Sequence, residues 1–317
     1  MIKGKVIKST GSWYLVQKED LEVIACRIIG KFRIGGIKLT NPVAVGDNVS
    51  FEMEGNKEEN KGIIKNILPR ENYVVRQSPR KKHALHLLAS NIDQAMVIVT
   101  VIQPMLKPGF IDRFLLMTEP HNIPTHIVFN KADLYDEEEF AMYAAMEEIY
   151  TSIGYQVHLI SAEKGIGMEE LHPVIKDKIT LISGQSGVGK STFINRIITS
   201  TVIKTQDISE YSGKGQHTTT FAEMFGLEIG GFVIDTPGIK TLSFNNLEPE
   251  DVAHNFREFF EKSHACKFGN CSHRNEPKCA VKEAIKAGEL SELRYFNYIQ
   301  ILEDIENQNY WERHTDF

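Results

Sequence analysis

The sequence predicts a multidomain α/β protein in which a small β-barrel precedes a parallel α/β domain and a helical C-terminal unit. Three observations support this fold class. Short apolar runs separated by turn signals fill the first 70 residues, strands and helices alternate from residue 85, and the chain turns helical after Pro249. Because 317 residues can form two or three domains with a core each, we expect domains at 1–84, 85–248 and 249–317.

The N-terminal unit is predicted to be a barrel of five short strands. This number of strands favours an OB-fold, a scaffold that often binds oligonucleotides, although an SH3-like barrel has a similar pattern. Residues 1–84 carry 16 Lys/Arg against 9 Asp/Glu, a balance of +7 in a chain whose net charge is −6. This asymmetry indicates a polyanion partner, and a solvated charged surface is the alternative. The expected strands are 3–10, 12–17, 21–29, 47–53 and 62–68.

The segment 69–83, "PRENYVVRQSPRKKH", is predicted to be a basic connector between the first two domains. It can touch phosphates, or it can be a solvated linker. Its basic residues are Arg70, Arg76, Arg80, Lys81 and Lys82.

The central region predicts a mostly parallel sheet, because helical patterns fill the gaps between apolar strands. In such a sheet a ligand binds at the carboxyl ends of the strands. The expected strands are 95–102, 125–130, 155–161, 179–184, 221–228 and 231–236. The expected helices are 109–120, 137–152, 167–177 and 190–198.

A phosphate-binding loop is predicted where "ITLISGQSGVGKSTFINRI" passes from a strand to a helix. Its glycines let backbone N–H groups surround phosphate oxygens, and the helix N-terminus adds partial positive charge. Lys190 is expected to reach the β- and γ-phosphates, and Ser191 to hold Mg²⁺. The predicted loop residues are Gly184, Gln185, Ser186, Gly187, Val188, Gly189, Lys190, Ser191 and Thr192.

Two further segments complete the phosphate side of the predicted site. In "VIDTPGIKTL" the Asp235 carboxylate is expected to act on Mg²⁺ through water, and the Gly238 N–H to face the γ-phosphate. Between this segment and the phosphate loop lies "YSGKGQHTTTF", where a switch loop is expected. A threonine there can complete the Mg²⁺ shell when the γ-phosphate is present. We choose Thr219, with Thr218 and Thr220 as close rivals.

Asn130-Lys131-Ala132-Asp133 follows an apolar strand and can read the edge of a guanine base. The Asp133 carboxylate can accept from the guanine N1–H and N2–H, a pair of donors that adenine does not offer. Asn130 can bond to N7 or tie neighbouring loops together, and the Lys131 stem can lie along the base. The next strand ends in Ser161-Ala162, where a backbone N–H can meet the guanine O6.

The order of these motifs is unusual, because the base reader precedes the phosphate loop by about 50 residues. A circular permutation explains this order, since chain ends that lie close in space can be joined without disturbing the core. We therefore predict a circularly permuted P-loop GTPase domain that takes GTP or GDP with Mg²⁺.

With these motifs in place, the chain resembles the RsgA family, circularly permuted GTPases of small ribosomal subunit maturation. The resemblance rests on "FIDRFL", "NKADL", "SGQSGVGKSTFIN", "IDTPGIKTL" and "CKFGNCSHRNEPKC", covers the chain from about residue 70 and is looser over the barrel. It implies an N-terminal OB-fold, a zinc subdomain, contact with rRNA, and GTP hydrolysis stimulated by the 30S subunit late in its maturation.

The residue that activates water is not the usual one. A glutamine commonly follows Asp-x-x-Gly, but this position holds Ile239, which cannot orient water. The resemblance suggests His217 in its place, and a side chain that titrates near neutral pH is chemically suitable. A contact of His217 with RNA or solvent is the alternative. Gln216 stands where the family usually has a basic residue, so a phosphate or rRNA contact there is in doubt.

Three of the four cysteines lie within 14 residues near the C-terminus, which favours a metal site over a disulfide framework. Cys266, Cys271, His273 and Cys279 offer three thiolates and an imidazole, a set that suits one structural, tetrahedral Zn²⁺. His264 is a rival ligand, and a metal-free thiol cluster is the alternative reading of the spacing. The family resemblance favours zinc.

Composition and hydropathy indicate a cytoplasmic globular protein without a membrane partner. The chain is 42% hydrophobic and 25% charged, its best apolar run, "AMVIVTVI", has only the length of a strand, and its N-terminus lacks the apolar stretch of a signal peptide. A monomer working on the 30S subunit and its rRNA is the simplest assembly. The alternative functions are a guanine-nucleotide sensor that binds RNA with negligible hydrolysis and, more remotely, a zinc-finger DNA regulator.

Overall fold

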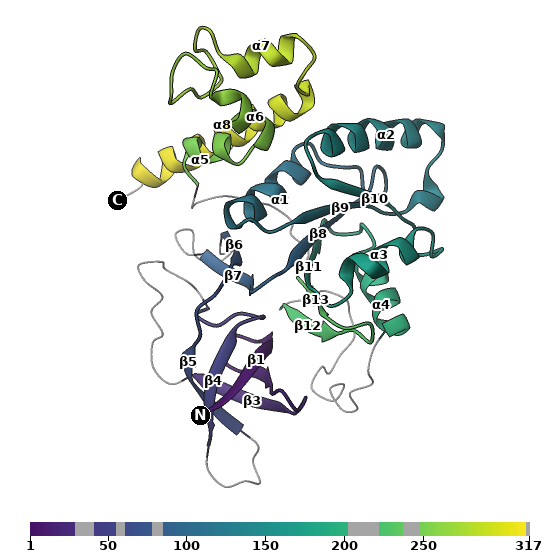
Figure 1. Ribbon diagram of the computed structural model, residues 1–317, viewed down its shortest axis with the longest axis vertical. Coiled ribbons are helices and arrows are strands. Elements are labelled where there is room, and N and C mark those ends of the chain that lie inside the picture. Colours follow the sequence, from purple (N-terminus) through teal and green to yellow (C-terminus); the bar gives the residue numbers. More distant parts are fainter. Residues whose placement is uncertain (29–40, 55–60, 78–84, 202–221, 237–246, 315–317) are drawn as a thin grey trace.

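The structure is a computed structural model that describes residues 1–28, 41–54, 61–77, 85–201, 222–236 and 247–314. Figure 1 shows three units: a barrel near the N-terminus, a layered α/β domain in the middle, and a group of helices at the opposite end.

The N-terminal unit is a five-stranded barrel with OB-like connectivity. The barrel is closed by strands β1 and β4, which pair antiparallel. Strands β3 and β5 pair in parallel. All five strands were predicted, because alternating apolar side chains such as Val6, Val16 and Phe51 point into the barrel and form its core. The strands are β1 (Ile2–Ser9), β2 (Tyr14–Gln17), β3 (Val23–Ile28), β4 (Asn48–Met53) and β5 (Lys61–Ile67).

The central domain contains the six expected strands in the order β10-β9-β8-β11-β13-β12. Five are parallel, and the edge strand β12 runs antiparallel to β13. The expected helices are confirmed. The strands are β8 (Gln94–Val99), β9 (Thr125–Phe129), β10 (Gln156–Leu159), β11 (Ile179–Gly184), β12 (Glu223–Gly226) and β13 (Phe232–Asp235). The helices are α1 (Phe110–Thr118), α2 (Glu137–Ser152), α3 (Met168–Ile175) and α4 (Lys190–Thr201).

Two helices cover each face of this sheet. Side chains of α1 and α2 pack with Val97, Val99 and Phe129 on one face. Side chains of α3 and α4 pack with Ile98 and Val128 on the other. Burial on both faces explains why these strands are continuous apolar runs, and the loops at their carboxyl ends are left free to carry polar groups.

The barrel and the central domain share one continuous sheet. Strand β1 pairs antiparallel with β12, with Lys8 opposite Glu223, and the two side chains form an ion pair of 3.0 Å. Eleven of the described strands therefore belong to a single sheet. The sequence analysis predicted both units but not this junction.

The prediction of a basic connector at 69–83 is wrong in two respects. Strand β6 (Tyr73–Gln77) lies inside it and pairs with β7 (Leu85–Ser90) as a two-stranded ribbon. Arg70 is also not available to a phosphate, because its guanidinium bonds both carboxylate oxygens of the buried Asp47 at 2.6 Å. The two strands of the ribbon lie on either side of the predicted limit at residue 84, and the domain limits stay predictions.

The C-terminal unit contains α5 (Pro249–His254), α6 (Arg257–Ser263), α7 (Ala280–Lys286) and α8 (Glu292–His314). It packs on α1, above the central domain in Figure 1. At the contact, the buried Arg294 of α8 bonds Asp112 of α1 and Glu258 of α6. No helix in the described part of the chain is both long and apolar enough to cross a membrane.

Candidate nucleotide-binding site and metal centre

The predicted phosphate loop connects β11 to the N-terminus of α4, as the strand and helix patterns require. Gly189 has a φ of +87°, and a Cβ at this position would lie 2.4 Å from Nδ2 of Asn130. A side chain is therefore excluded at residue 189 both by the backbone conformation and by the base-reading segment. The phosphate loop and the "NKAD" segment are in direct contact.

Lys190 is buried at the start of α4. Its ammonium donates to the carbonyl oxygen of Thr236 and lies 2.9 Å from a carboxylate oxygen of Asp235. Asp235 ends β13, whose register places it beside Ile182 of β11. The predicted phosphate-binding cation and the predicted Mg²⁺-directed carboxylate thus meet at one edge of the sheet.

Asn130 links three loops at this edge. Its side chain is 2% exposed, its Nδ2 donates to the carbonyl of Val188 at 2.8 Å, and its Oδ1 accepts from the Ala162 N–H at 2.9 Å. Tyr135 donates to the backbone carbonyl of Asn130 at 2.9 Å. Of the two roles considered for Asn130, the structure provides the loop tie, and it commits the Ala162 N–H to that tie.

Asp133 and Lys131 lie on either side of this tie. The exposed Asp133 carboxylate accepts a hydrogen bond from the hydroxyl of Ser161, which orients it toward the loop after β10. Lys131 adopts φ +68°, and its ammonium donates to the carbonyl of Gln103 in the loop after β8. The carboxylate is thereby held at the loop after β10 and the lysine stem at the loop after β8, and groups of this kind can recognise a base edge and a base face.

The remaining predicted residues divide into two groups. Ser186 and Gly187 are exposed at the tip of the loop, Ser191 and Thr192 are exposed in the first turn of α4, and Gln185 is buried. The Ser191 hydroxyl and the Asp235 carboxylate are hard oxygen donors of the kind that Mg²⁺ binds. Gly238, His217 and Thr219, with Gln216, Thr218, Thr220 and Ile239, lie outside the described residues.

The four predicted zinc ligands come together in the C-terminal unit. Their ligand atoms all lie within 4.8 Å of one another. Nδ1 of His273 lies 3.4 Å from Sγ of Cys279 and 3.8 Å from Sγ of Cys266. Tetrahedral Zn²⁺ with ordinary bond lengths separates a nitrogen and a sulfur ligand by about 3.6 Å. The cluster is therefore compatible with zinc.

The chemistry of this cluster also favours a cation. Burial raises the pKa of the Cys271 thiol to about 12 and lowers the pKa of His273. The thiolates are consequently disfavoured unless a positive ion lies among them, whereas the neutral imidazole is already in the form that binds a metal. The rival ligand His264 is not in the cluster, and its ring packs against Phe260 at 5.3 Å.

Sequence reasoning missed the backbone groups that hold the site together. The carbonyls of Gln103, Val188 and Thr236 each accept a hydrogen bond from a predicted functional side chain. Carbonyls carry no sequence signal of their own. Val188 and Thr236 lie inside motifs that the sequence already offered, whereas Gln103 lies in none.

The chain matches two family models along most of its length. Residues 3–64 match the RsgA N-terminal domain, and residues 67–245 match the RsgA GTPase. A protein of Bacteroides thetaiotaomicron named small ribosomal subunit biogenesis GTPase RsgA 2 is 47% identical over 98% of this chain and 99% of its own length. A small ribosomal subunit biogenesis GTPase RsgA of Christiangramia forsetii is 47% identical over 98% of both chains.

Two solved structures resemble the whole chain. YjeQ from Thermotoga maritima has a TM-score of 0.74 and 36% identity, covering 96% of this chain and 98% of its own. YloQ, described as a circularly permuted GTPase, has a TM-score of 0.72 and 33% identity, covering 97% and 96%. The permuted order of motifs is thus found in a chain of the same fold.

Proposed function

This chain belongs to the RsgA family of GTPases, and from that membership we propose that it hydrolyses GTP to GDP and phosphate during biogenesis of the small ribosomal subunit. The relatives that it matches over almost their full length carry this function in their names. The observation that carries the proposal is the Asn130 side chain, which bonds the phosphate loop at Val188 and the loop after β10 at Ala162. This double contact makes the base reader and the phosphate loop one binding site.

In this site the guanine base lies over the Lys131 stem, and Asp133 accepts its N1–H and N2–H. Support comes from the hydrogen bond that Ser161 donates to Asp133 and from the contact between Lys131 and Gln103, which keep both side chains at the mouth of the site. Ala162 and Ser161 form the wall nearest the guanine O6. A carboxylate at this edge rejects adenine, which offers no matching pair of donors.

The phosphates lie in the loop 184–191, against the N-terminus of α4 and the Lys190 ammonium. Ser191 and Asp235 would hold Mg²⁺, which neutralises phosphate charge when bound, with Thr219 completing the shell and the Gly238 N–H facing the γ-phosphate. The adjacency of Lys190 and Asp235 supports this arrangement. When nucleotide and Mg²⁺ are bound, Lys190 would contact the phosphates and Asp235 would hold the cation.

Water is positioned by His217 in this proposal, because Ile239 has no group that can do so. A low intrinsic rate follows in this proposal, because residue 239 is not the glutamine that usually orients the water. Binding to the small subunit would accelerate hydrolysis by setting His217 against that water. The charge balance of +7 in residues 1–84 supports binding of rRNA by the barrel.

The C-terminal unit holds one structural Zn²⁺ in this proposal, through Cys266, Cys271, His273 and Cys279. Four protein ligands leave no position open for a substrate, so the ion would stabilise the unit and take no part in hydrolysis. A cytoplasmic monomer that acts on the particle completes the proposal.

The experiment is a multiple-turnover assay of phosphate release from GTP, with and without purified small ribosomal subunits at matched salt. We expect slow release by the protein alone and at least about a hundredfold acceleration by the subunits, the lower end of what a positioned acid–base group contributes. His217→Ala is expected to lose the acceleration while still binding GTP. Equal rates with and without subunits would instead favour the guanine-nucleotide sensor, and an unaffected His217→Ala variant would remove that residue from the mechanism.

A further inference from the structure

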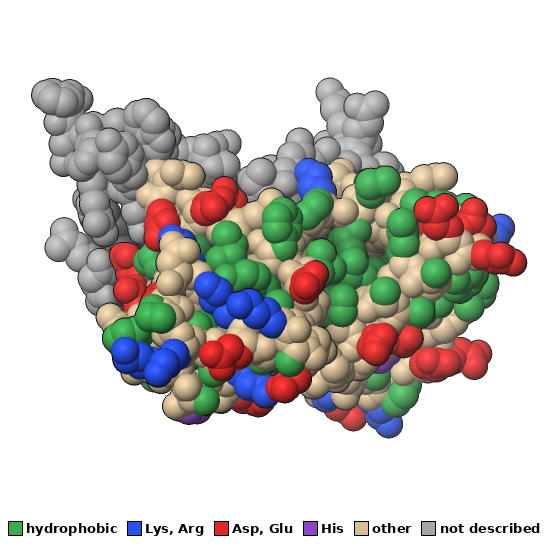
Figure 2. All heavy atoms as spheres, turned by 90° about the horizontal axis from the view of Figure 1, so that it is seen from above, with side chains coloured by type: hydrophobic (Ala, Val, Ile, Leu, Met, Phe, Trp, Pro, Cys, Tyr) green, Lys and Arg blue, Asp and Glu red, His purple; other side chains and the backbone are tan. Residues whose placement is uncertain are grey.

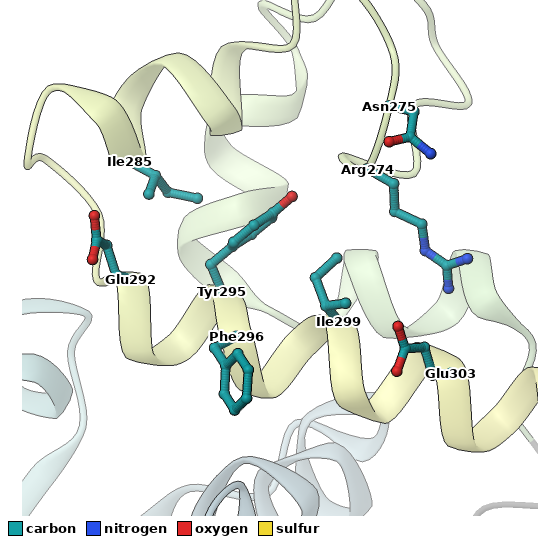
Figure 3. Close-up of a pocket in the computed structure, with 8 residues that line it drawn as sticks. All are labelled: Arg274, Asn275, Ile285, Glu292, Tyr295, Phe296, Ile299 and Glu303. Carbon is teal, nitrogen blue, oxygen red and sulfur yellow. The ribbon is translucent and has the colours of Figure 1, made fainter.

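The C-terminal unit contains an open groove that the nucleotide and zinc chemistry leave unexplained. It has a volume of about 770 Å³ and lies between α7, α8 and the loop 272–279. In Figure 3, Tyr295 and Ile299 of α8 lie between Glu292 and Glu303, and Arg274 faces them from the loop. The groove adjoins the metal cluster without including any of its four ligands.

The groove uses a face of α8 that the fold does not need. One face of this helix is buried, with Arg294, Tyr298 and Ile301 packed into the core of the unit. The groove face carries Glu292, Tyr295, Phe296, Ile299 and Glu303. These positions recur every three or four residues, so they form a single stripe along the helix.

The middle of this stripe is apolar and accessible. Ile285, Tyr295 and Ile299 rest on the core with one side and line the groove with the other, and Phe296 is 55% exposed. Figure 2 views the molecule from this end, and hydrophobic side chains gather across the middle of that face. An apolar strip rimmed by charge is the usual form of a protein docking site.

The charge of the groove selects the kind of partner. Both ends of the stripe are exposed glutamates, and within the described residues neither Glu292 nor Glu303 takes part in an ion pair. Among the described residues of the lining, Arg274 is the only cation, and the two carboxylate oxygens of Glu306 lie 3.0 and 2.9 Å from its Nη1 and offset its charge. The lining thus repels a phosphate backbone and attracts positively charged side chains.

The groove is also held in shape without a partner. The Tyr295 hydroxyl donates to the carbonyl of His273 at 2.8 Å, and the Lys282 ammonium donates to the carbonyl of Arg274 at 2.6 Å. These bonds fix the loop wall to α8 and α7. Because this wall is already ordered, binding of a partner costs less conformational entropy.

From these observations we propose that the groove binds a basic segment of a protein partner, with an apolar side chain seated on Tyr295 and Ile299 and a cation at each glutamate. Glu292 and Glu303 are 11 residues apart, which along an α-helix is about 16 Å. The partner segment therefore carries Lys or Arg residues separated by roughly that distance, with apolar residues between them. This interaction is separate from nucleotide hydrolysis and does not depend on it.

The test uses a fluorescently labelled helical peptide of about 18 residues, with two lysines 11 positions apart and Leu and Phe between them on the same face. Binding to the full chain is measured by fluorescence anisotropy. The groove variant is Glu292→Lys with Glu303→Lys. The matched control, Glu261→Lys with Glu283→Lys, makes the same charge change at exposed glutamates of the same unit that lie outside the groove.

We expect the wild-type chain to bind this peptide and the groove variant to bind it at least about tenfold more weakly, since two attractive pairs become repulsive. The control variant is expected to stay within about twofold, and circular dichroism with zinc content verifies that both variants fold. No binding by the wild type, or an equal loss in both variants, overturns the proposal. The proposal is also overturned if a single-stranded RNA oligonucleotide displaces the peptide, because the occupant is then RNA. It is overturned as well if the wild-type chain sediments as a dimer and the groove variant as a monomer, because the occupant is then a second copy.

Discussion

Asn130 is the residue on which the geometry of the nucleotide site depends most. It carries no charge, yet its amide satisfies a carbonyl of the phosphate loop and an N–H of the loop after β10. Val188 and Ala162 are 0% and 1% exposed, so these backbone groups have no access to water and would be left unpaired without the amide. Of the two roles that the sequence allowed for Asn130, a base contact and a tie between loops, the hydrogen bonds of the structure correspond to the tie.

The brace can be tested with Asn130→Ala. We expect the affinity for GDP, measured by fluorescence titration, to fall at least about tenfold, because the phosphate loop and the base-reading loops lose their common anchor. Asn41→Ala is the matched control, since Asn41 is also buried and bonds both the N–H and the carbonyl of Leu87, far from the site. Its variant should lose stability and keep its affinity for GDP, and equal affinity losses in the two variants would contradict the brace.

The functional side chains of the site could be predicted from the sequence, and their partners could not. Each of these side chains belongs to a short motif that folds as one local loop, so the motif itself determines where the side chain lies. They are Lys190, Asp235 and Asp133. Gln103 contributes only a carbonyl from a loop after β8 without periodicity. Such contacts depend on how loops that are distant in the sequence come together in the fold. A local sequence pattern cannot predict them.

At the level of elements, a histidine pair joins β9 and β10. Nδ1 of His126 lies 3.1 Å from Nε2 of His158, a contact in which one ring donates and the other accepts. If both rings were protonated, the N–H groups at Nδ1 of His126 and Nε2 of His158 would point at each other with no acceptor between them. Burial, with the charge of His158 as the next cause, lowers the pKa of His126 to about 4.

The pair makes stability sensitive to acid. Since the folded pKa of His126 lies below the ordinary 6.5, the unfolded chain binds the proton first, and stability falls as the pH drops from about 6.5 toward 4. We expect His126→Gln to reduce this loss by on the order of 2 kcal/mol between pH 6.5 and 4.5, measured by urea unfolding. His172→Gln on α3 is the control, and identical pH profiles for wild type and His126→Gln would rule out this role of the pair.

A second element-level device fixes the C-terminal helices to α1. Arg294 is almost fully buried, bonds Glu258 at 2.8 and 2.9 Å, and also bonds Asp112, which in turn accepts from Asn297 at 2.5 Å and Tyr150 at 2.8 Å. Two carboxylates around one guanidinium are tolerated in the interior only while the cation stays in place. The orientation of the unit on α1 therefore depends on this arginine.

Arg294→Met should accordingly destabilise the protein by about 3 to 5 kcal/mol, because it leaves two carboxylates buried without a cation. Chemical denaturation measures the change. Lys262→Met, which breaks the solvent-exposed pair with Glu289, is the comparison and should cost under about 1 kcal/mol. Similar costs for the two variants would mean that the buried network contributes no more than a surface pair.

The elements themselves were largely predictable, but both strands of the β6–β7 ribbon were missed. Apolar strands such as β8 and β11 are recognisable because burial on both faces leaves almost no polar residues in them. Strand β6 was missed because "YVVRQ" lies between basic and proline-containing stretches, and its apolar Val74 was outweighed by them. Segment β6 becomes a strand because it pairs with β7, and this pairing cannot be recognised from the residues of β6 alone.

On the scale of the whole molecule, the C-terminal unit is expected to depend on its metal. Purified protein should contain about one zinc per chain, and Cys271→Ser should lose zinc and unfold at lower temperature, since metal binding by such a small unit is coupled to its folding. Cys26→Ser is the control, because Cys26 is buried in the barrel and lies outside the cluster. Equal zinc contents in wild type and Cys271→Ser, measured by atomic emission, would exclude the cluster as the site.

The assembly of the units is the part that the sequence could not predict. Each unit has its own signature of periodicity and turns, but the pairing of β1 with β12 joins residues 215 positions apart through an ion pair of Lys8 with Glu223. This pairing covers the edge strand of the nucleotide-binding sheet with the barrel. The barrel thereby sits next to the chain segment that follows the predicted switch loop. In the proposed function, binding of rRNA at the barrel could act on the nucleotide site through this junction.

The most direct test of the account is the nucleotide selectivity of Asp133→Asn in the phosphate-release assay with small ribosomal subunits. In the proposed function, the "NKAD" segment recognises guanine although it precedes the phosphate loop in the chain. An amide at residue 133 donates where the carboxylate accepted, so it suits xanthine, which has a carbonyl in place of the guanine N2–H. We predict that the variant releases phosphate from XTP and only poorly from GTP, with its zinc content and fold unchanged. Wild-type activity of Asp133→Asn on GTP, with none on XTP, would contradict the assignment of the guanine site.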